Sequence, residues 1–316
     1  MDHLAGKRHL WFAISGLLLL PCVLSLIFAG LKFGIDFTGG SSWEIQFDRD
    51  VSTEDISNVL ASNGRTETTV QQVGDEDEHR YLIRMEELEE GSAEKATLEE
   101  QLGTLGTLQP EGESLNTVGA SVGESIRNRS VFAVLAAAVG ILLYIAFAFR
   151  NTQNPLLYGI AAICAMLHDA IFVLGIFSIL GWVTDVEVDA LFITALLTVI
   201  GFSVHDTIVV FDRIRENLAL RVSPSFEEVV NYSIAQTLVR SLNTSITVVI
   251  TLSALFLFGG SSTREFVLAL LIGVVIGTYS SIFNASQILV AWEAGEIQGF
   301  WNRLFRRQGK VNPSTT

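Results

Sequence analysis

Long runs of apolar residues, separated by short polar stretches, make up most of this sequence. A membrane-spanning helix needs about 20 mostly apolar residues, because each residue adds about 1.5 Å along the helix axis. Six runs come close to that length, so the pattern predicts a polytopic α-helical membrane protein with six transmembrane helices. The runs cover residues 10–30, 131–149, 156–180, 191–211, 239–258 and 266–292.

The segment between the first two runs, residues 31–126, has a different pattern. Trp43, Ile45 and Phe47 alternate with polar residues, which is typical of a strand that buries one face. The segment as a whole predicts an α+β domain with the element order β-α-β-β-α-β, which is that of a ferredoxin-like fold. The predicted strands are 43–47, 66–73, 81–85 and 115–122, and the predicted helices are 53–62 and 92–102.

Two local patterns add detail to the prediction for the fifth and sixth apolar runs. Ser225 and Glu228 have the spacing of a capping box, which predicts an amphipathic helix lying along the membrane surface before the fifth run. The sixth run carries small or polar residues at helical spacing, and small residues let two helices approach closely. These residues are Gly273, Gly277, Ser280 and Asn284.

The net charge of −14 is distributed unevenly along the chain. Residues 31–126 hold 21 acidic and 6 basic residues, whereas the rest of the chain holds 13 acidic and 14 basic residues. The sequence therefore predicts an acidic, water-soluble domain joined to a nearly neutral membrane body. A basic surface for nucleic acid is not indicated, so we expect no nucleic-acid partner.

The sequence does not contain the usual motifs for ATP hydrolysis, zinc binding or nucleophilic catalysis. The sequence has no GxxxxGK[ST] phosphate-binding motif, so we do not expect this chain to hydrolyse ATP. Cys22 and Cys164 fall inside predicted membrane helices, where cysteine usually acts as a small apolar side chain. No Cys/His spacing indicates a zinc site, and no Ser-His-Asp arrangement indicates nucleophilic catalysis. We therefore expect no metal, no cofactor and no enzymatic activity.

The basic residues that flank the runs predict the topology. Ten lie on the side of the two termini and four on the other side, which places the termini in the cytoplasm. Arg127 and Arg129 lie against this rule. The first run exceeds the core of about 7–15 residues of a signal peptide, so we expect an uncleaved helix. The predicted parts are 1–30 with the first helix, the external domain 31–126, helices two to six in 127–294, and a basic cytoplasmic tail 295–316.

Asp206 and Arg240 stand out because they lie in or at the edge of apolar runs. A carboxylate at membrane depth costs about 3 kcal/mol, so an ionisable group there is a candidate functional residue. Burial disfavours the charged carboxylate and a nearby guanidinium favours it, so a helix shift that separates the pair would protonate Asp206. We therefore predict a proton relay formed by these two residues. The alternative is a buried polar group that ties two helices together.

Other polar residues of the runs are candidates for accessory positions in such a relay. Thr244 and Thr247 follow Arg240 on one helix face, where they could line a hydrated path or bond back to their own helix. Two His-Asp dipeptides occur, and adjacent residues point about 100° apart on a helix. We expect the two members of each dipeptide to face different partners. The accessory candidates are His205, Asp169, His168, Thr244 and Thr247.

Several stretches resemble a known family of membrane proteins. GIDFTGG at 34–40 is similar to the signature that follows the first helix of the SecD and SecF proteins. GFSVHDTIVVFDRIREN at 201–217 and QTLVRSLNTSITVVITLSALFLFGG at 236–260 resemble the fourth and fifth helices of the SecF branch, and the resemblance extends to the other spans. The signature residues are Gly34, Asp36, Gly39 and Gly40.

The resemblance implies a member of the resistance-nodulation-division superfamily in the cytoplasmic membrane. SecF proteins pair with SecD, assist the SecYEG translocon and use the proton gradient to complete preprotein export. The relay Asp and Arg of the family correspond to Asp206 and Arg240, whereas the position of His205 is usually Asn. The alternatives are a small-molecule exporter of the same superfamily and a structural scaffold of the translocon that is not coupled to protons.

Overall fold

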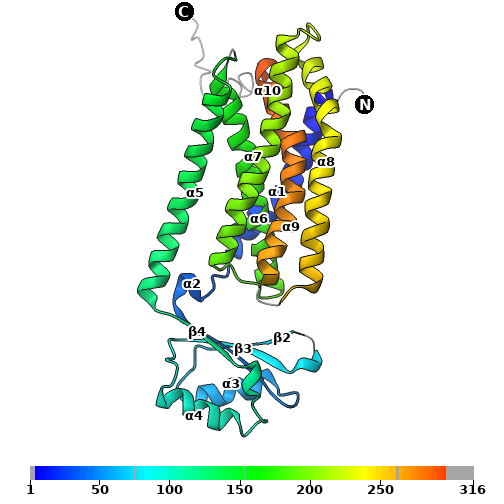
Figure 1. Cartoon of the computed structure of the whole chain (residues 1–316). Helices are drawn as coiled ribbons and strands as arrows, with labels where there is room; N and C mark the ends of the chain where they lie inside the picture. The colour runs from blue at the N-terminus through cyan, green and yellow to red at the C-terminus, as the bar shows by residue number, and fades with distance from the viewer. Residues whose placement is uncertain (1–3, 75, 153, 261–262, 297–316) are drawn as a thin grey trace, which may run out of the picture. The chain divides into compact units, whose positions relative to one another are not determined.

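The structure is a computed structural model that describes residues 4–74, 76–152, 154–260 and 263–296. Most of the predicted cytoplasmic tail, from residue 297, lies outside the described residues. Six helices of the described part are long and apolar enough to cross a membrane, which confirms the predicted class of fold. The chain forms two units (Figure 1), which we describe separately. The α+β domain contains Lys32–Ala133 and Glu187–Ile193, and the described residues of the other segments form the membrane unit.

The α+β domain has the predicted ferredoxin-like topology. Its four strands are all antiparallel to their neighbours and lie in the order β2-β3-β1-β4. Both helices cover the same face of the sheet (Figure 1). The elements are β1 Gly40–Gln46, α3 Thr53–Ser62, β2 Thr69–Val73, β3 Arg80–Met85, α4 Ala93–Leu102 and β4 Ser114–Val118.

The core of this domain follows from the alternation along β1. Trp43, Ile45 and Phe47 are buried between the sheet and the two helices, as the pattern predicted. Lys95 of α4 is also buried and lies within 3 Å of three glutamate carboxylates, including that of Glu113. Burial lowers the pKa of Lys95, but the hydrogen bonds to these carboxylates outweigh it and raise the pKa.

The junction after this domain differs from the prediction. The last strand ends at Val118, and a single helix, α5, runs over Ala120–Ala148. The predicted strand 115–122 is therefore too long, and the predicted helix 131–149 starts 11 residues too late. The first turns of α5 are polar and lack an apolar stripe, so periodicity gives no signal for them. A four-residue helix, α2 (Ile35–Thr38), was also not predicted.

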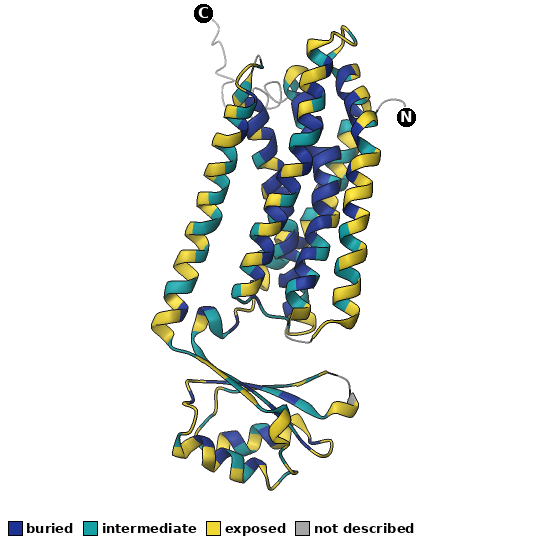
Figure 2. Ribbon diagram, viewed as in Figure 1, coloured by how far each residue is buried: buried dark blue, intermediate teal, exposed yellow. Residues whose placement is uncertain are grey.

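The helices of the membrane unit agree with the predicted runs, apart from their ends. The third and sixth spans are the most buried, while α1, α5 and α8 expose much apolar surface, as expected of helices that face lipid. Figure 2 shows the exposed positions along α5 and α8. In the sixth span, a π-helical segment, η5, separates α9 from α10. The remaining elements are α1 Arg8–Phe28, α6 Pro155–Val183, α7 Ala190–Ala219, α8 Phe226–Phe258, α9 Arg264–Ser280, η5 Ser281–Ala285 and α10 Ser286–Glu293.

The predicted surface helix before the fifth span is wrong. Phe226–Phe258 is one continuous helix, because neither Gly nor Pro interrupts its sequence. The capping box is also absent: Ser225 makes no capping hydrogen bond through its side chain, and Glu228 accepts a hydrogen bond from Ser223 instead. The amphipathic turns therefore extend the fifth span.

The small residues of the sixth span pack against α7, which confirms the predicted close approach. A methyl group built on Gly273 would lie 2.1 Å from a side-chain carbon of Val199, and one on Gly277 would lie 3.1 Å from Ser203. Ser281 continues the series, since its hydroxyl lies 2.9 Å from that of Thr207. Contacts four residues apart on both helices indicate that α7 and the sixth span run side by side over several turns.

Candidate functional site

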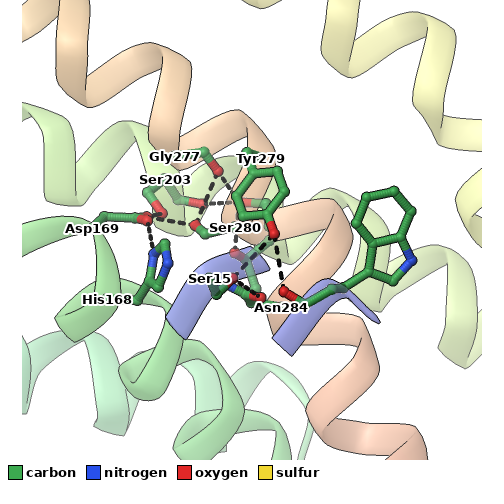
Figure 3. Close-up of polar contacts among 11 residues, drawn as sticks. Ser15, His168, Asp169, Ser203, Gly277, Tyr279, Ser280 and Asn284 are labelled. Atoms are coloured by element: carbon green, nitrogen blue, oxygen red, sulfur yellow. Dashed lines mark hydrogen bonds and ion pairs between the residues drawn. The ribbon is translucent and has the colours of Figure 1, made fainter. Parts of the chain in front are cut away.

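Asp169, in the middle of α6, is completely buried and is held by three side chains (Figure 3). His168 Nδ1 lies 2.9 Å from one carboxylate oxygen. The other oxygen accepts hydrogen bonds from Ser203 of α7 and, at 2.6 Å, from Ser280 of α9. Asp169 therefore joins three spans through a single carboxylate.

The sixth span changes its helical geometry beside this cluster. Ser281, the first residue of η5, donates a hydrogen bond to the backbone oxygen of Ser203 at 2.9 Å and accepts one from Thr207. Short π-helical segments often occur at functional sites, because they redirect side chains that a regular helix would place elsewhere. Here consecutive serines contact two different helices, because Ser280 donates to Asp169 of α6 and Ser281 to Ser203 of α7.

A second group of hydrogen bonds connects the sixth span to α1. Ser15 donates to Asn284 at 2.8 Å, and its hydroxyl lies 3.1 Å from that of Tyr279 (Figure 3). Tyr279 in turn donates to the backbone oxygen of Trp11. Polar contacts therefore cross the membrane unit from α1 to α7 through the sixth span.

Sequence reasoning missed most of this network. Ser15, Ser203 and Tyr279 were not identified, and Ser280 and Asn284 were identified only as packing residues. Single hydroxyl residues are common in membrane helices, and the sequence does not reveal which helices face each other. The expectation that His168 and Asp169 face different partners also overlooked their direct contact.

Asp206, the principal candidate from the sequence, is also buried on α7, with 5% of its surface exposed. One carboxylate oxygen accepts a hydrogen bond from Ser241 of α8 at 2.9 Å. The other oxygen is buried and has no hydrogen-bond partner among the described residues. Asp206 therefore faces α8, as expected, but contacts the residue after Arg240 rather than Arg240 itself.

The remaining relay candidates lie on the exposed side of these two helices. Arg240 and His205 are exposed within this chain. Thr244 and Thr247 are exposed as well and bond back to backbone oxygens four residues earlier, at 3.0 and 2.8 Å. This is the alternative that the spacing left open, and the threonines do not line a path inside the described part of the chain.

The two buried carboxylates therefore have different surroundings. Asp169 has a neighbour for both oxygens, and such a carboxylate is fixed in place. Asp206 has one oxygen without a partner, and a buried unpaired carboxylate oxygen is unfavourable unless the group binds a proton or gains a donor. The geometry suits proton exchange at Asp206 and attachment of helices at Asp169. No group of three or more His, Cys, Asp and Glu among the described residues could hold a metal ion.

The signature residues lie in the α+β domain, at the start of the loop that leads into β1. Asp36 belongs to α2, and its carboxylate accepts a hydrogen bond from the backbone amide of Ala190 at 2.8 Å. Gly34 donates its amide to the backbone oxygen of Val188 at 2.9 Å. Gly39 and Gly40 both have positive φ, a conformation that favours glycine.

Comparisons with known proteins agree on one family. Residues 97–295 match the family described as "Protein export membrane protein SecD/SecF, C-terminal", and residues 24–51 match the "SecD/SecF GG Motif". The chain is 52% identical to the protein translocase subunit SecF of Thermobaculum terrenum, over 95% of each chain. It is 40% identical to the corresponding subunit of Anaerolinea thermophila, over 98% of this chain and 99% of that one.

A solved structure has the same fold. The crystal structure of SecDF, a translocon-associated membrane protein from Thermus thermophilus, superimposes with a TM-score of 0.79 at 35% sequence identity. The match covers 92% of this chain and 38% of that chain. This chain therefore corresponds to little more than a third of that larger protein.

Proposed function

Because this chain belongs to the SecF family of protein translocase subunits, we propose that it couples proton flow to the export of preproteins. In this proposal it pairs with SecD in the cytoplasmic membrane and acts at the SecYEG translocon. Asp206 is the proton carrier, and Arg240 sets its charge. Asp169, His168, Ser203 and Ser280 hold α7, the helix that carries Asp206, against its neighbouring helices.

One observation carries this proposal: Asp206 is buried within a membrane-spanning helix, and one of its carboxylate oxygens has no partner in the part of the chain that the structure describes. Ser241 provides a hydrogen bond that suits either a neutral or a charged carboxyl group. Arg240 precedes Ser241 and points about 100° away from it, so a rotation of α8 of that order would exchange a hydroxyl for a guanidinium beside Asp206. That exchange would favour release of the proton.

The energetics allow one proton to bias such a switch. A charge that crosses the membrane potential gains about 2.3 kcal/mol per 100 mV. Reversal of a two-state equilibrium from 1:99 to 99:1 needs about 5.5 kcal/mol. A single proton therefore shifts the equilibrium substantially, whereas full reversal needs a pH difference or a second proton as well.

The exposed polar residues of α7 and α8 support a partner subunit. Arg240, His205, Thr244 and Thr247 are exposed within this chain, although they belong to spanning helices. A charged side chain at the bilayer centre costs about 3 kcal/mol, so lipid is an unfavourable neighbour for Arg240. A SecD helix that covers this face would remove the cost and complete the relay.

In this proposal, the basic residues that flank the spans determine the orientation of the chain in the membrane. The two termini lie in the cytoplasm, and the acidic α+β domain lies outside, where a preprotein emerges. A scaffold of the translocon without proton coupling would have the same topology but no need for Asp206.

The proposal is tested by export in cells that depend on this chain and its partner. Asp206→Asn keeps the size of the side chain and an acceptor for Ser241 but cannot carry a proton. We expect normal accumulation and partner binding, together with loss of the part of export that an uncoupler abolishes. Asp212→Asn, on the same helix but half-exposed, is the matched control and should export normally. Normal, uncoupler-sensitive export by Asp206→Asn would move the relay elsewhere, with Asp169 the next candidate.

A further inference from the structure

The membrane unit has a cavity of about 420 Å³ at the place where α6 and α8 begin and α7 and α10 end. This volume lies in the usual range of small-molecule binding sites, which is about 300–1,000 Å³. None of the relay candidates is among the described residues that line it. Because the surrounding helices belong to spans of the membrane, the cavity lies near the boundary between lipid and water.

Tyr158, in the first turn of α6, lines this cavity and has a hydroxyl group without a partner. The residue is only 5% exposed, and its ring stacks on that of Phe149 at 5.0 Å and meets that of Phe211 edge-on at 5.3 Å. The hydroxyl group makes no hydrogen bond to any residue that the structure describes, although the charges of Glu293 and Arg215, two other lining residues, act on it. A buried phenol usually has a hydrogen-bond partner, so a ligand in the cavity would satisfy it.

Arg215 and the start of α6 provide positive charge to the cavity. Arg215 lies 2.5 Å from Asp212 and donates to the backbone oxygen of Ala148 at 3.4 Å, but a guanidinium has five N–H groups, so donors remain. Helix α6 begins at Pro155, and the side chain of Asn154 does not cap it, so the first amides of the helix lack such a partner. A guanidinium beside the start of a helix is a typical environment for a phosphate group.

Glu293, at the end of α10, adds a negative charge to the same lining. Its side chain is exposed, and none of the ion pairs among the described residues includes it. Arg215 and Glu293 therefore line one cavity without being paired with each other. Glu293 would repel a purely anionic ligand, and Arg215 would repel a purely cationic one, so a ligand that carries both charges fits best.

We propose that this cavity binds the headgroup of a zwitterionic phospholipid that has a phosphate group and a primary amine. The phosphate accepts hydrogen bonds from Arg215, Tyr158 and the first amides of α6, and the ammonium group faces Glu293. Leu218 and Leu289 also line the cavity and provide apolar surface for the glycerol backbone. A lipid bound there connects the ends of three spanning helices. The inference does not depend on the role of Asp206.

Native mass spectrometry of the purified complex of this chain with its partner tests the proposal, because bound lipids are identified by their mass. Phosphatidylethanolamine, phosphatidylglycerol and phosphatidylcholine with identical acyl chains are added separately to the complex in detergent. We expect one phosphatidylethanolamine to bind about tenfold more tightly than the other two lipids, because only its amine donates hydrogen bonds to a carboxylate. Equal affinities for the three lipids would overturn the proposal.

Variants of the lining residues assign this binding to the cavity. Arg215→Gln and Tyr158→Phe should each weaken phosphatidylethanolamine binding about tenfold, because each removes a donor to a charged phosphate. Glu293→Gln should remove the preference for phosphatidylethanolamine over phosphatidylglycerol while both still bind. Arg213→Gln, at the same end of α7 but outside the cavity, is the matched control and should bind the lipid normally.

Tyr158→Phe also keeps the proposal testable if Arg215→Gln does not accumulate. This variant removes one hydroxyl group and leaves the aromatic contacts with Phe149 and Phe211 in place, so we expect it to fold. An unchanged affinity for phosphatidylethanolamine in Tyr158→Phe would show that the lipid binds elsewhere and would overturn the proposal.

Soluble compounds distinguish a lipid from a free phosphate as the ligand. Inorganic phosphate and phosphoethanolamine are added to the complex loaded with phosphatidylethanolamine, at the concentration of the lipid. We expect neither to displace the lipid, because neither contains the glycerol and acyl groups that contact apolar surface. Displacement by phosphoethanolamine at this concentration would contradict the assignment to a lipid and would indicate a site for a soluble phosphate ester.

Discussion

At the residue scale, the same side chain has two different environments in neighbouring helices. Within the described ranges, Asp169 is hydrogen-bonded to His168, Ser203 and Ser280, whereas Asp206 is hydrogen-bonded to Ser241 alone. Both aspartates lie in apolar runs of the sequence and follow a histidine, so the pattern alone did not reveal their different surroundings. The difference depends on which helix faces each carboxylate, and pairing of helices is not visible in one chain's pattern.

Removal of one donor from Asp169 should destabilise the membrane unit. In Ser280→Ala the carboxylate stays buried but loses a hydrogen bond of 2.6 Å, which we expect to cost about 1–3 kcal/mol. The measurement is the thermal unfolding midpoint of the purified chain in detergent. Thr247→Ala is the matched control, because that hydroxyl is exposed and bonds only to its own helix. Equal midpoints for the two variants would show that Asp169 does not depend on Ser280.

At the scale of elements, the sequence predicted the existence of every long helix and strand but placed some ends wrongly. Apolar runs and alternation are strong signals where an element is buried on one side. The polar first turns of α5 and the amphipathic start of α8 carry no such signal, so residues 120–130 were left out of the second span and residues 226–238 were assigned to a separate surface helix. The π-helical segment η5 has no sequence signal that we could use, although it directs Ser281 toward α7.

The contact between α7 and the sixth span predicts a specific steric effect. Gly273→Leu would force the helices apart, because even a methyl group at this position would overlap Val199. Overpacking of this kind typically costs about 1–3 kcal/mol or more, so we expect a lower unfolding midpoint and less accumulated protein. Gly140→Leu in α5 is the control, since a methyl group there meets nothing within 4 Å.

A double variant at Gly273 and Val199 distinguishes steric crowding between the two helices from the effect of replacing a glycine within its own helix. Val199→Ala removes the methyl groups that the new side chain would meet, so Gly273→Ala should be tolerated better in that background than alone. Equal losses in both backgrounds would show that Gly273 is not needed for the contact with α7.

At the scale of the whole molecule, the distribution of charge predicts the side of the membrane on which each part lies. The acidic α+β domain should be outside and the termini inside. In a variant without Cys22 and Cys164, a cysteine at exposed Glu67 should react with an impermeant thiol reagent added to intact cells. Reaction only after lysis would place the domain in the cytoplasm and would contradict both the orientation and the role in export.

The sequence singled out Asp206 and Asp36 but not the contact between Asp36 and the helix that carries Asp206. Asp206 was singled out by its position inside an apolar run, and Asp36 by the family resemblance. That Asp36 caps the helix carrying Asp206 depends on a contact between residues 154 positions apart. Such contacts are set by tertiary packing, so only the structure could supply them.

The central claim, that Asp206 carries protons, is tested most directly by proton flux. This chain and its partner, reconstituted in lipid vesicles containing a pH-sensitive dye, would be exposed to an imposed pH gradient. We expect flux in the unmodified complex, no flux above that of empty vesicles in Asp206→Asn, and partial flux in Asp206→Glu, which keeps an ionisable carboxyl group. Undiminished flux in Asp206→Asn would contradict the account.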